Sequence, residues 1–231
     1  MVGIVSDLEL RVRRTFEAVE AAATRANRDP KTVTVVAVSK TVGRNAVDES
    51  YASGVRHFGE NRVPDAVRKF DPPLPEDAVL HMIGQLQTNK ASIAARLFNL
   101  IESVDRQSLI LELEKQGSKL NRVLPVLLQV NVAGEEQKAG CELAEADSLI
   151  DMIIDCPHLK LRGLMTIAPL VSDSEEVRPV FRGLRTLRDK LVTSRQGIDL
   201  PELSMGMSND FPVAIEEGAT FVRVGRAIFE G

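Results

Sequence analysis

One lysine has a position that suits covalent chemistry. Lys40 ends the apolar stretch TVTVVAVSK at 32–40, so its side chain would lie at the end of a buried strand. A lysine amine that is removed from water or placed near other cations loses its proton more easily, and the neutral amine attacks a carbonyl carbon to form a Schiff base. A strand-end lysine can equally extend its charged group into solvent. Position alone leaves both interpretations open.

Two segments later in the chain suit anion binding. They are SMGMSND at 204–210 and RVGRA at 223–227. Ser204 could donate its hydroxyl group, Gly225 would allow main-chain N–H groups to approach an anion, and Ser208 would cap a following helix. Gly, Ser and Asn are also the usual residues of turns between strands and helices. Each segment alone is therefore consistent with a phosphate site or with an ordinary turn.

The other polar candidates carry weaker signals. Asn61 follows a strand candidate, and its amide could hydrogen-bond to a ring hydroxyl or to a neighbouring loop. His57 and His81 fall inside strand patterns, which favours a place in the interior over a catalytic role. Cys141 and Cys156 lack the neighbours of a zinc site or a disulfide framework, so we interpret them as packing residues and expect no metal. Spacing assigns no role to four charged residues near strand ends, Glu102, Asp105, Lys138 and Asp210.

Alternating strand and helix patterns must position these residues. An amphipathic helix over 4–27 comes first, with apolar residues at every third or fourth position. Stretches rich in β-branched residues then alternate with helical patterns along the rest of the chain. The strand candidates are 32–40, 55–61, 79–84, 99–104, 123–132, 159–167, 202–207 and 220–225.

This regular alternation favours a parallel sheet, because a parallel pair of strands requires a helical crossover. Eight such units close into a (β/α)8 TIM barrel, and an open doubly wound sheet is the alternative. With 231 residues and no linker-like segment, we expect a single domain over 1–231, with the helix over 1–28 packing on the barrel. Active sites of such barrels lie at the carboxyl ends of the strands, which would gather Lys40, Asn61 and the two glycine-containing segments at one mouth.

Composition argues against several classes of partner. The net charge is −4, aromatic residues make up 4% of the chain and Trp is absent, so nothing favours a nucleic-acid partner. No apolar run approaches the roughly 18–20 residues of a membrane span, and the N-terminus lacks a signal-peptide pattern. We therefore expect a cytoplasmic protein with no membrane partner. The absence of a large uncharged surface stripe favours a monomer.

Ordered motifs across the chain give a more specific indication. They are AVSKT at 37–41, HFGENRV at 57–63, HMIGQLQTNK at 81–90, SVDR at 103–106, QVNVAGEEQKAG at 129–140, RGLMTI at 162–167, LSMGMSND at 203–210 and RVGRAIF at 223–229. Eight motifs in one order make chance similarity improbable, although each alone would mean little. The chain resembles the YggS/PROSC family of pyridoxal phosphate homeostasis proteins, which form single barrels related to the N-terminal domain of alanine racemase.

The resemblance implies a pyridoxal 5′-phosphate cofactor. Lys40 is similar to the lysine that holds this cofactor as an aldimine, and Arg223 is similar to the arginine that faces the pyridine nitrogen. Asn61 resembles a residue that lines the ring, and Met165 and Met205 are expected to border it.

The resemblance also assigns a phosphate site, with two departures nearby. Ser204, with the main chain of Gly225 and Arg226, is similar to the phosphate-binding group of the family. The family often has a small hydroxyl residue where this chain has Arg226, so one side-chain hydrogen bond to phosphate is in doubt. Gln85 stands where a histidine is common, which removes any role of that imidazole.

The function implied by the resemblance is carriage of the cofactor in intracellular vitamin B6 homeostasis, without a catalytic residue. Racemisation on this fold resembles a two-base process that needs a tyrosine from a separate β domain, and Tyr51 instead falls in a helical stretch. Pyridoxal-phosphate-dependent apoenzymes are the expected acceptors. The alternatives are a low-activity amino-acid racemase with Lys40 as sole base, a cofactor-free Schiff-base aldolase and a pure interaction module.

Overall fold

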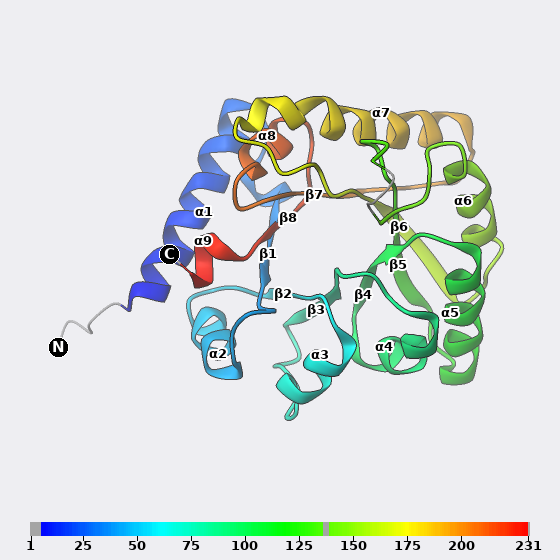
Figure 1. The fold of residues 1–231 in the computed structure, drawn as a ribbon, viewed down its shortest axis with the longest axis horizontal. Helices are drawn as coiled ribbons and strands as arrows, with labels where there is room; N and C mark the ends of the chain where they lie inside the picture. Colours follow the sequence, from blue (N-terminus) through cyan, green and yellow to red (C-terminus); the bar gives the residue numbers. More distant parts are fainter. Residues whose placement is uncertain (1–5, 136–138, 231) are drawn as a thin grey trace.

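Eight parallel strands hydrogen-bond in chain order, and the last pairs with the first, which closes a barrel (Figure 1). The computed structural model describes residues 6–135 and 139–230. The strands are β1 (Thr34–Val38), β2 (His57–Glu60), β3 (Val79–Met82), β4 (Leu100–Val104), β5 (Leu124–Gln129), β6 (Leu159–Met165), β7 (Glu202–Met207) and β8 (Phe221–Val224). The predicted barrel is confirmed, and the open sheet is wrong because β1 pairs with both β2 and β8.

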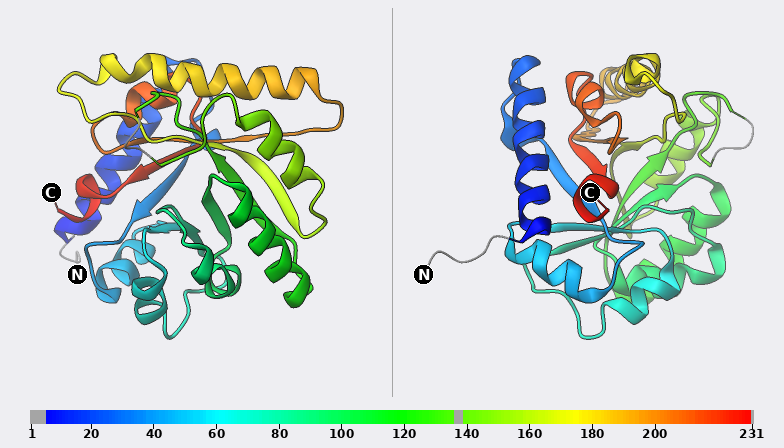
Figure 2. Two further views of the ribbon diagram at one scale, coloured as in Figure 1. Left: turned by 45° about the vertical axis from the view of Figure 1, so that its right-hand side comes forward. Right: turned by 60° about the vertical axis from the view of Figure 1, so that its left-hand side comes forward.

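Helices surround the ring of strands (Figures 1 and 2). They are α1 (Asp7–Arg25), α2 (Arg44–Ala52), α3 (Val63–Lys69), α4 (Ala91–Leu97), α5 (Gln107–Leu120), α6 (Ala146–Ile154), α7 (Arg178–Ser194), α8 (Phe211–Glu216) and α9 (Arg226–Phe229), with 3₁₀ turns η1 (Pro30–Thr32), η2 (Thr88–Lys90) and η3 (Ser174–Val177). Sequence analysis missed α9, because four residues are too short to show a helical period.

The first helix, α1, covers one side of the barrel. Ser6 caps its start by accepting a hydrogen bond from the Glu9 main-chain N–H at 3.1 Å. The helix packs against α8 and α9 (Figure 2), and Arg11 Nε donates to the Ile228 carbonyl oxygen at 2.8 Å. Its buried apolar residues are Leu8, Val12, Val19, Ala22 and Ala23. Residues 4 and 5 of the expected helix lie outside the described residues, as do residues 136–138 of the motif at 129–140.

Side chains alternate between the inside and the outside of the barrel along each strand. The residues facing the lumen include a small apolar cluster formed by Val36, Leu100, Leu127, Met165 and Phe221. The larger core lies between strands and helices and contains Cys141, Cys156 and Met205. Both cysteines are therefore buried packing residues, as the sequence predicted. Met205 belongs to the outer core, so its expected place beside a bound ring is wrong.

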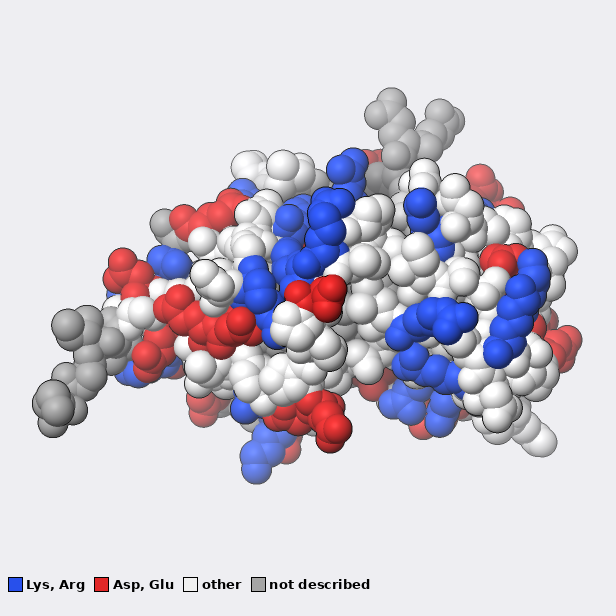
Figure 3. Space-filling model, turned by 90° about the horizontal axis from the view of Figure 1, so that it is seen from below, with Lys and Arg blue, Asp and Glu red and all other residues white. Residues whose placement is uncertain are grey.

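Charged side chains of both signs share the surface seen from below the view of Figure 1 (Figure 3). Among the described residues, no helix is long and apolar enough to cross a membrane. The same residues contain no group of three or more His, Cys, Asp or Glu side chains that could hold a metal ion.

Candidate functional site

A cavity of about 470 Å³ lies at the carboxyl ends of the strands. Five of the six predicted site residues line it, namely Lys40, Asn61, Arg223, Gly225 and Arg226. The sixth, Ser204, does not. The remaining lining residues are Val38, Thr41, Ile83, Gly84, Ile167, Leu170, Met207, Ser208, Asn209, Asp210 and Glu230.

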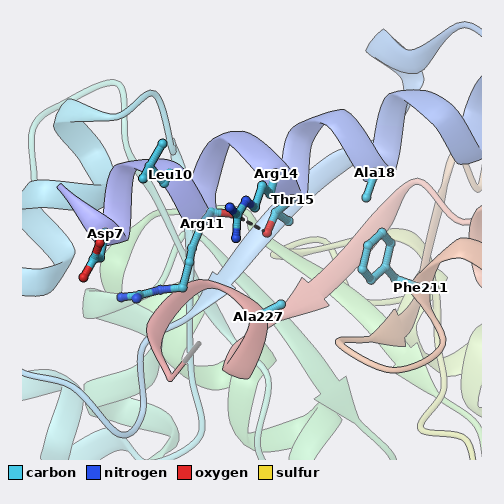
Figure 4. A pocket seen from close by; sticks show the side chains of 8 residues that line it. All are labelled: Asp7, Leu10, Arg11, Arg14, Thr15, Ala18, Phe211 and Ala227. Carbon is cyan, nitrogen blue, oxygen red and sulfur yellow. Dashed lines mark hydrogen bonds between the residues drawn. The ribbon is translucent and has the colours of Figure 1, made fainter. Parts of the chain in front are cut away.

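A second hollow, of about 520 Å³, lies outside the barrel between α1 and the C-terminal helices (Figure 4). Arg11 reaches from α1 toward α9 at its edge, and the Thr15 hydroxyl donates to the Arg11 carbonyl at 2.9 Å. None of the predicted site residues lines this hollow. The cavity at the strand ends is therefore the candidate site.

The alternation of β1 places Lys40 on the cavity side. Val36 lies in the lumen cluster and Val38 lines the cavity, so Lys40, two residues further on, continues the same face. The Lys40 side chain is exposed, and no hydrogen bond or ion pair to the described residues holds it. Its amine is thus available to a ligand that enters the cavity.

Arg223 forms a fixed cationic part of the cavity wall. The residue is 4% exposed, and its guanidinium group donates to Ser204 Oγ at 2.6 Å and to the Thr166 carbonyl at 2.7 Å. Burial lowers the pKa of Arg223, and the charges of Glu102 and Asp210 oppose that shift. These contacts orient the guanidinium before any ligand binds.

Ser204 lies below the cavity, inside the lumen. Its side chain is fully buried, and its hydroxyl donates to Glu102 Oε2 at 2.5 Å while accepting from Arg223. The single O–H donor that a phosphate would use is therefore already engaged by Glu102. Ser204 does not line the cavity in which the other five predicted site residues meet.

Two histidines continue the hydrogen bonding from Glu102 toward the amino ends of the strands. His81 Nδ1 contacts Glu102 Oε1 at 2.6 Å, and His81 Nε2 contacts His57 Nδ1 at 2.9 Å. Phe221 packs edge-on against the His81 ring, with 5.3 Å between centroids. The interior place expected for both histidines is confirmed, but their link to Glu102 was not foreseen.

Hydrogen bonds favour a charged Glu102, whereas burial favours a neutral His57. Although burial alone would raise the pKa of Glu102, hydrogen bonds from His81 and Ser204 and the charge of Arg223 lower it below its usual value. Burial, aided by the charge of His81, lowers the pKa of His57 to about 4. Glu102 opposes this second shift without reversing it.

The low pKa of His57 predicts a loss of stability in mild acid. The unfolded chain takes up a proton on this histidine near pH 6.5, whereas the folded chain does so only near pH 4. The midpoint of thermal unfolding should therefore fall as the pH decreases from about 6.5 to 4. In His57→Gln, which does not titrate, the fall should be smaller. Equal slopes in the two proteins would contradict this assignment.

The loop after β7 brings polar groups to the cavity rim. Gly206 has φ +91°, and a Cβ there would lie 2.6 Å from Ala214 Cβ, so glycine is required by conformation and by space. Asp210 Oδ1 accepts from the Met207 N–H, and Ser208 Oγ accepts from the Ala227 N–H at 3.4 Å. Ser208 is the serine of this segment that faces the cavity.

The opposite rim is built where the loops after β2 and β3 meet. A Cβ on Gly84 would lie 2.2 Å from the Asn61 carbonyl oxygen, so the absence of a side chain permits this close approach. The Arg226 side chain is exposed and makes no hydrogen bond or ion pair to the described residues. Gln85 and Met165 do not line this cavity. Met165 is fully buried in the lumen cluster.

Several site residues gave too little signal in the sequence. In the sequence, Glu102 and Asp210 stand out only as charges near strand ends. Met207 is an apolar residue within the segment 204–210 and gives no separate indication of a site. Glu60, next to Asn61, is fully buried and pairs with Lys69 Nζ at 2.6 Å on the outer side of β2. An acidic residue inside a predicted strand could have pointed to Glu60 and Glu102, because a carboxylate that is buried with its strand requires a partner.

Fold and site together define a (β/α)8 barrel of the type found in alanine racemase. The sequence profile of the alanine racemase N-terminal domain matches residues 16–231. An alanine racemase of Clostridium difficile superposes with a TM-score of 0.73 at 10% identity, over 95% of this chain and 56% of that one, which supports the fold alone.

More similar proteins specify the family. A protein of Aquifex aeolicus called pyridoxal phosphate homeostasis protein is 43% identical over 95% of this chain and 96% of its own length. The Escherichia coli protein of the same name is 38% identical over 97% of both chains. The structure of PipY from Synechococcus elongatus with bound PLP has a TM-score of 0.81 at 37% identity, over 92% of this chain and 99% of that one. This chain belongs to the YggS/PROSC family of pyridoxal phosphate homeostasis proteins.

Proposed function

We propose that this protein binds pyridoxal 5′-phosphate covalently on Lys40 and carries it in vitamin B6 homeostasis. The observation that carries the proposal is the cavity of about 470 Å³, in which an unpaired lysine amine and an anchored arginine line the same space. This volume is within the range of roughly 300–1,000 Å³ that is typical of small-molecule sites. The names of the relatives and the PLP-bound structure of PipY support the same cofactor.

The residues of the cavity suit each chemical part of the cofactor. Pyridoxal phosphate supplies an aldehyde that condenses reversibly with a primary amine, and Lys40 offers such an amine. Ser208, with the main chain of Gly225 and Arg226, would hold the phosphate group, and Arg223 would face the ring nitrogen. Asn61 would contact the ring from the opposite rim. Ser208 thus takes the role that sequence analysis assigned to Ser204.

Arg223 favours carriage over carbanion chemistry. Because arginine keeps its positive charge, it disfavours protonation of a nearby ring nitrogen. An unprotonated pyridine ring withdraws electrons less strongly than one paired with a carboxylate, so a carbanion next to it gains less stabilisation. The chain's residues can therefore bind and exchange the aldehyde without strongly promoting proton abstraction from a bound amino acid.

The racemase alternative gains no support from the cavity. Tyr51 lies on α2, where its hydroxyl donates to Asp77 Oδ1 at 2.5 Å, and it does not line the cavity. Lys40 would be left as the candidate base on one side of a substrate. We propose a non-catalytic protein that acts as a monomer in the cytoplasm and delivers the cofactor to apoenzymes.

Ser208→Ala tests the phosphate site. Loss of the hydroxyl should weaken cofactor binding by about 1–3 kcal/mol, the usual effect of losing a hydrogen bond to a charged group. The dissociation constant can be measured by titrating the apoprotein with pyridoxal phosphate and following absorbance. Asn209→Ala, which removes the neighbouring polar side chain on the same rim, is the matched control. An unchanged constant in Ser208→Ala would mean that main-chain groups alone hold the phosphate.

The function itself is tested by the absorption spectrum of the purified protein after incubation with pyridoxal phosphate. We expect a visible band that borohydride abolishes, at one cofactor per chain, with the reduced pyridoxyl group on Lys40 in peptide mass analysis. If no band forms with excess cofactor, the proposal fails. A lysine adduct with a keto substrate in the absence of cofactor would then favour the aldolase.

A further inference from the structure

We infer that Glu102 and Ser204 are positioning residues for Arg223 and thereby set the charge presented to the ring nitrogen. This inference rests on the proposed function. His57, His81, Glu102, Ser204 and Arg223, here called the lumen chain, are joined by successive hydrogen bonds of 2.5–2.9 Å. The lumen chain begins at the first residue of β2 and ends at a residue that lines the cavity.

The donors and acceptors of the lumen chain allow one arrangement around Glu102. Arg223 can only donate, so Ser204 Oγ accepts from it and turns its own hydrogen to Glu102 Oε2. Oε1 of the carboxylate then accepts from the Nδ1–H of His81. Both oxygens of Glu102 are thereby engaged, and the Ser204 hydroxyl has no freedom to rotate. The position of Arg223 is consequently fixed by a carboxylate that the ligand does not touch.

The charges within the lumen chain also balance. Glu102 is fully buried and Arg223 is 4% exposed, and a buried charge without a partner is strongly unfavourable. Ser204 separates the two charges by one hydroxyl group, so Glu102 compensates Arg223 without occupying the guanidinium directly. The Thr166 carbonyl provides the other anchor of the guanidinium. Arg223 therefore keeps its positive charge, which Glu102 compensates from inside the lumen, and its guanidinium can still face the cavity.

The lower part of the lumen chain holds Glu102 in place. His81 is fully buried between Glu102 and His57, and its ring packs against Phe221. Val36, Leu127 and Met165, which are apolar and fully buried, also face the lumen. An apolar lumen could have been completed without five polar residues, since buried polar groups contribute little unless every partner is present. The connection to the cavity gives these residues a role that packing alone does not require.

The test compares Glu102→Gln and Ser204→Ala with Ser204→Thr and Glu217→Gln. Glu217 is 3% exposed and pairs with arginines outside the barrel, so Glu217→Gln controls for the loss of a buried, arginine-paired carboxylate. Each variant is incubated with pyridoxal phosphate. Circular dichroism reports folding, peptide mass analysis after borohydride reports the Lys40 adduct, and absorbance reports the wavelength of the bound cofactor and its dissociation constant.

We expect the Lys40 adduct in every folded variant. In Glu102→Gln and Ser204→Ala the cofactor band should move and the dissociation constant should rise about tenfold or more, because the Ser204 side of the Arg223 anchorage is weakened or lost and only the Thr166 carbonyl remains unchanged. Ser204→Thr, which keeps the hydroxyl, and Glu217→Gln should resemble the wild type. An unmoved band and constant in folded Ser204→Ala would overturn the inference, even if Glu102→Gln does not fold. Absence of the adduct from the wild type would instead overturn the proposed function.

Discussion

Replacing Lys40 with alanine is expected to abolish covalent incorporation of pyridoxal phosphate and to leave the fold unchanged. The lysine supplies the primary amine on this wall of the cavity, and no other lysine lines it among the described residues. Its exposed side chain makes no hydrogen bond or ion pair to those residues, so the free energy of unfolding should change by no more than about 0.5 kcal/mol.

The measurement is the reducible absorbance band together with the mass of the Lys40 peptide after borohydride treatment. Lys160→Ala provides the control, because Lys160 on β6 is likewise an exposed lysine but does not line the cavity. The control should retain a full complement of cofactor. A wild-type spectrum in Lys40→Ala, with the pyridoxyl group on another lysine, would show that the assignment is wrong.

Arg223→Met should have the largest effect on stability. The substitution removes the cation and leaves Glu102 fully buried with hydrogen bonds from Ser204 and His81 only. Breaking a buried ion pair from one side typically costs about 3–5 kcal/mol. Glu102 and Arg223 are not in direct contact, but Arg223 compensates the charge of Glu102 through the Ser204 hydroxyl, so its removal likewise leaves a buried charge without its counter-charge. We expect a decrease of this size in the free energy of unfolding, measured by urea denaturation of the apoprotein.

The double variant Arg223→Met/Glu102→Gln separates this electrostatic cost from simple loss of packing. Because it removes both charges, it should be less destabilised than the sum of the two single variants, with a coupling energy of about 1–3 kcal/mol. Additive effects would mean that the two residues act independently despite the hydrogen bonds through Ser204. The stability measurement needs no cofactor, so it tests the lumen chain separately from the proposed function.

The barrel could be predicted from the sequence because apolar residues recur at regular spacings in its helices and β-branched residues are concentrated in its strands. The apolar stretch 32–40 also sufficed to place Lys40 at the carboxyl end of the first strand, because the lysine directly ends that stretch. Both arguments use residues close to each other in the chain. Neither requires knowledge of how one strand is shifted against the next.

The depth of Ser204 inside the barrel could not be predicted from the sequence. In β7 the pairing with β8 is irregular, since Ser204 pairs with Phe221 but Met207 pairs with Arg223, which places three residues of β7 against two of β8. This bulge, next to the positive φ of Gly206, carries Ser208 to the cavity while Ser204 remains inside the lumen. Two serines four residues apart look equally suitable in the sequence, and the difference in depth between them depends on the bulge.

The contacts of Glu102 depend on several strands at once. Its hydrogen-bond partners, His81 and Ser204, lie on β3 and β7, and Arg223 follows on β8. Their meeting is fixed by the tilt and stagger of the closed barrel, which the pattern of a single strand does not report. Sequence analysis could therefore identify the polar residues without pairing them.

The pairing of the first strand with the last has a consequence for biosynthesis. One wall of the cavity comes from residues 38–41 and another from residues 223–226, and these segments become neighbours only when β8 has joined β1. A chain still emerging from the ribosome has its lysine long before it has the arginine that completes the site. Uptake of the cofactor should therefore follow completion of the barrel, so that holoprotein forms only from chains whose translation and folding have both finished.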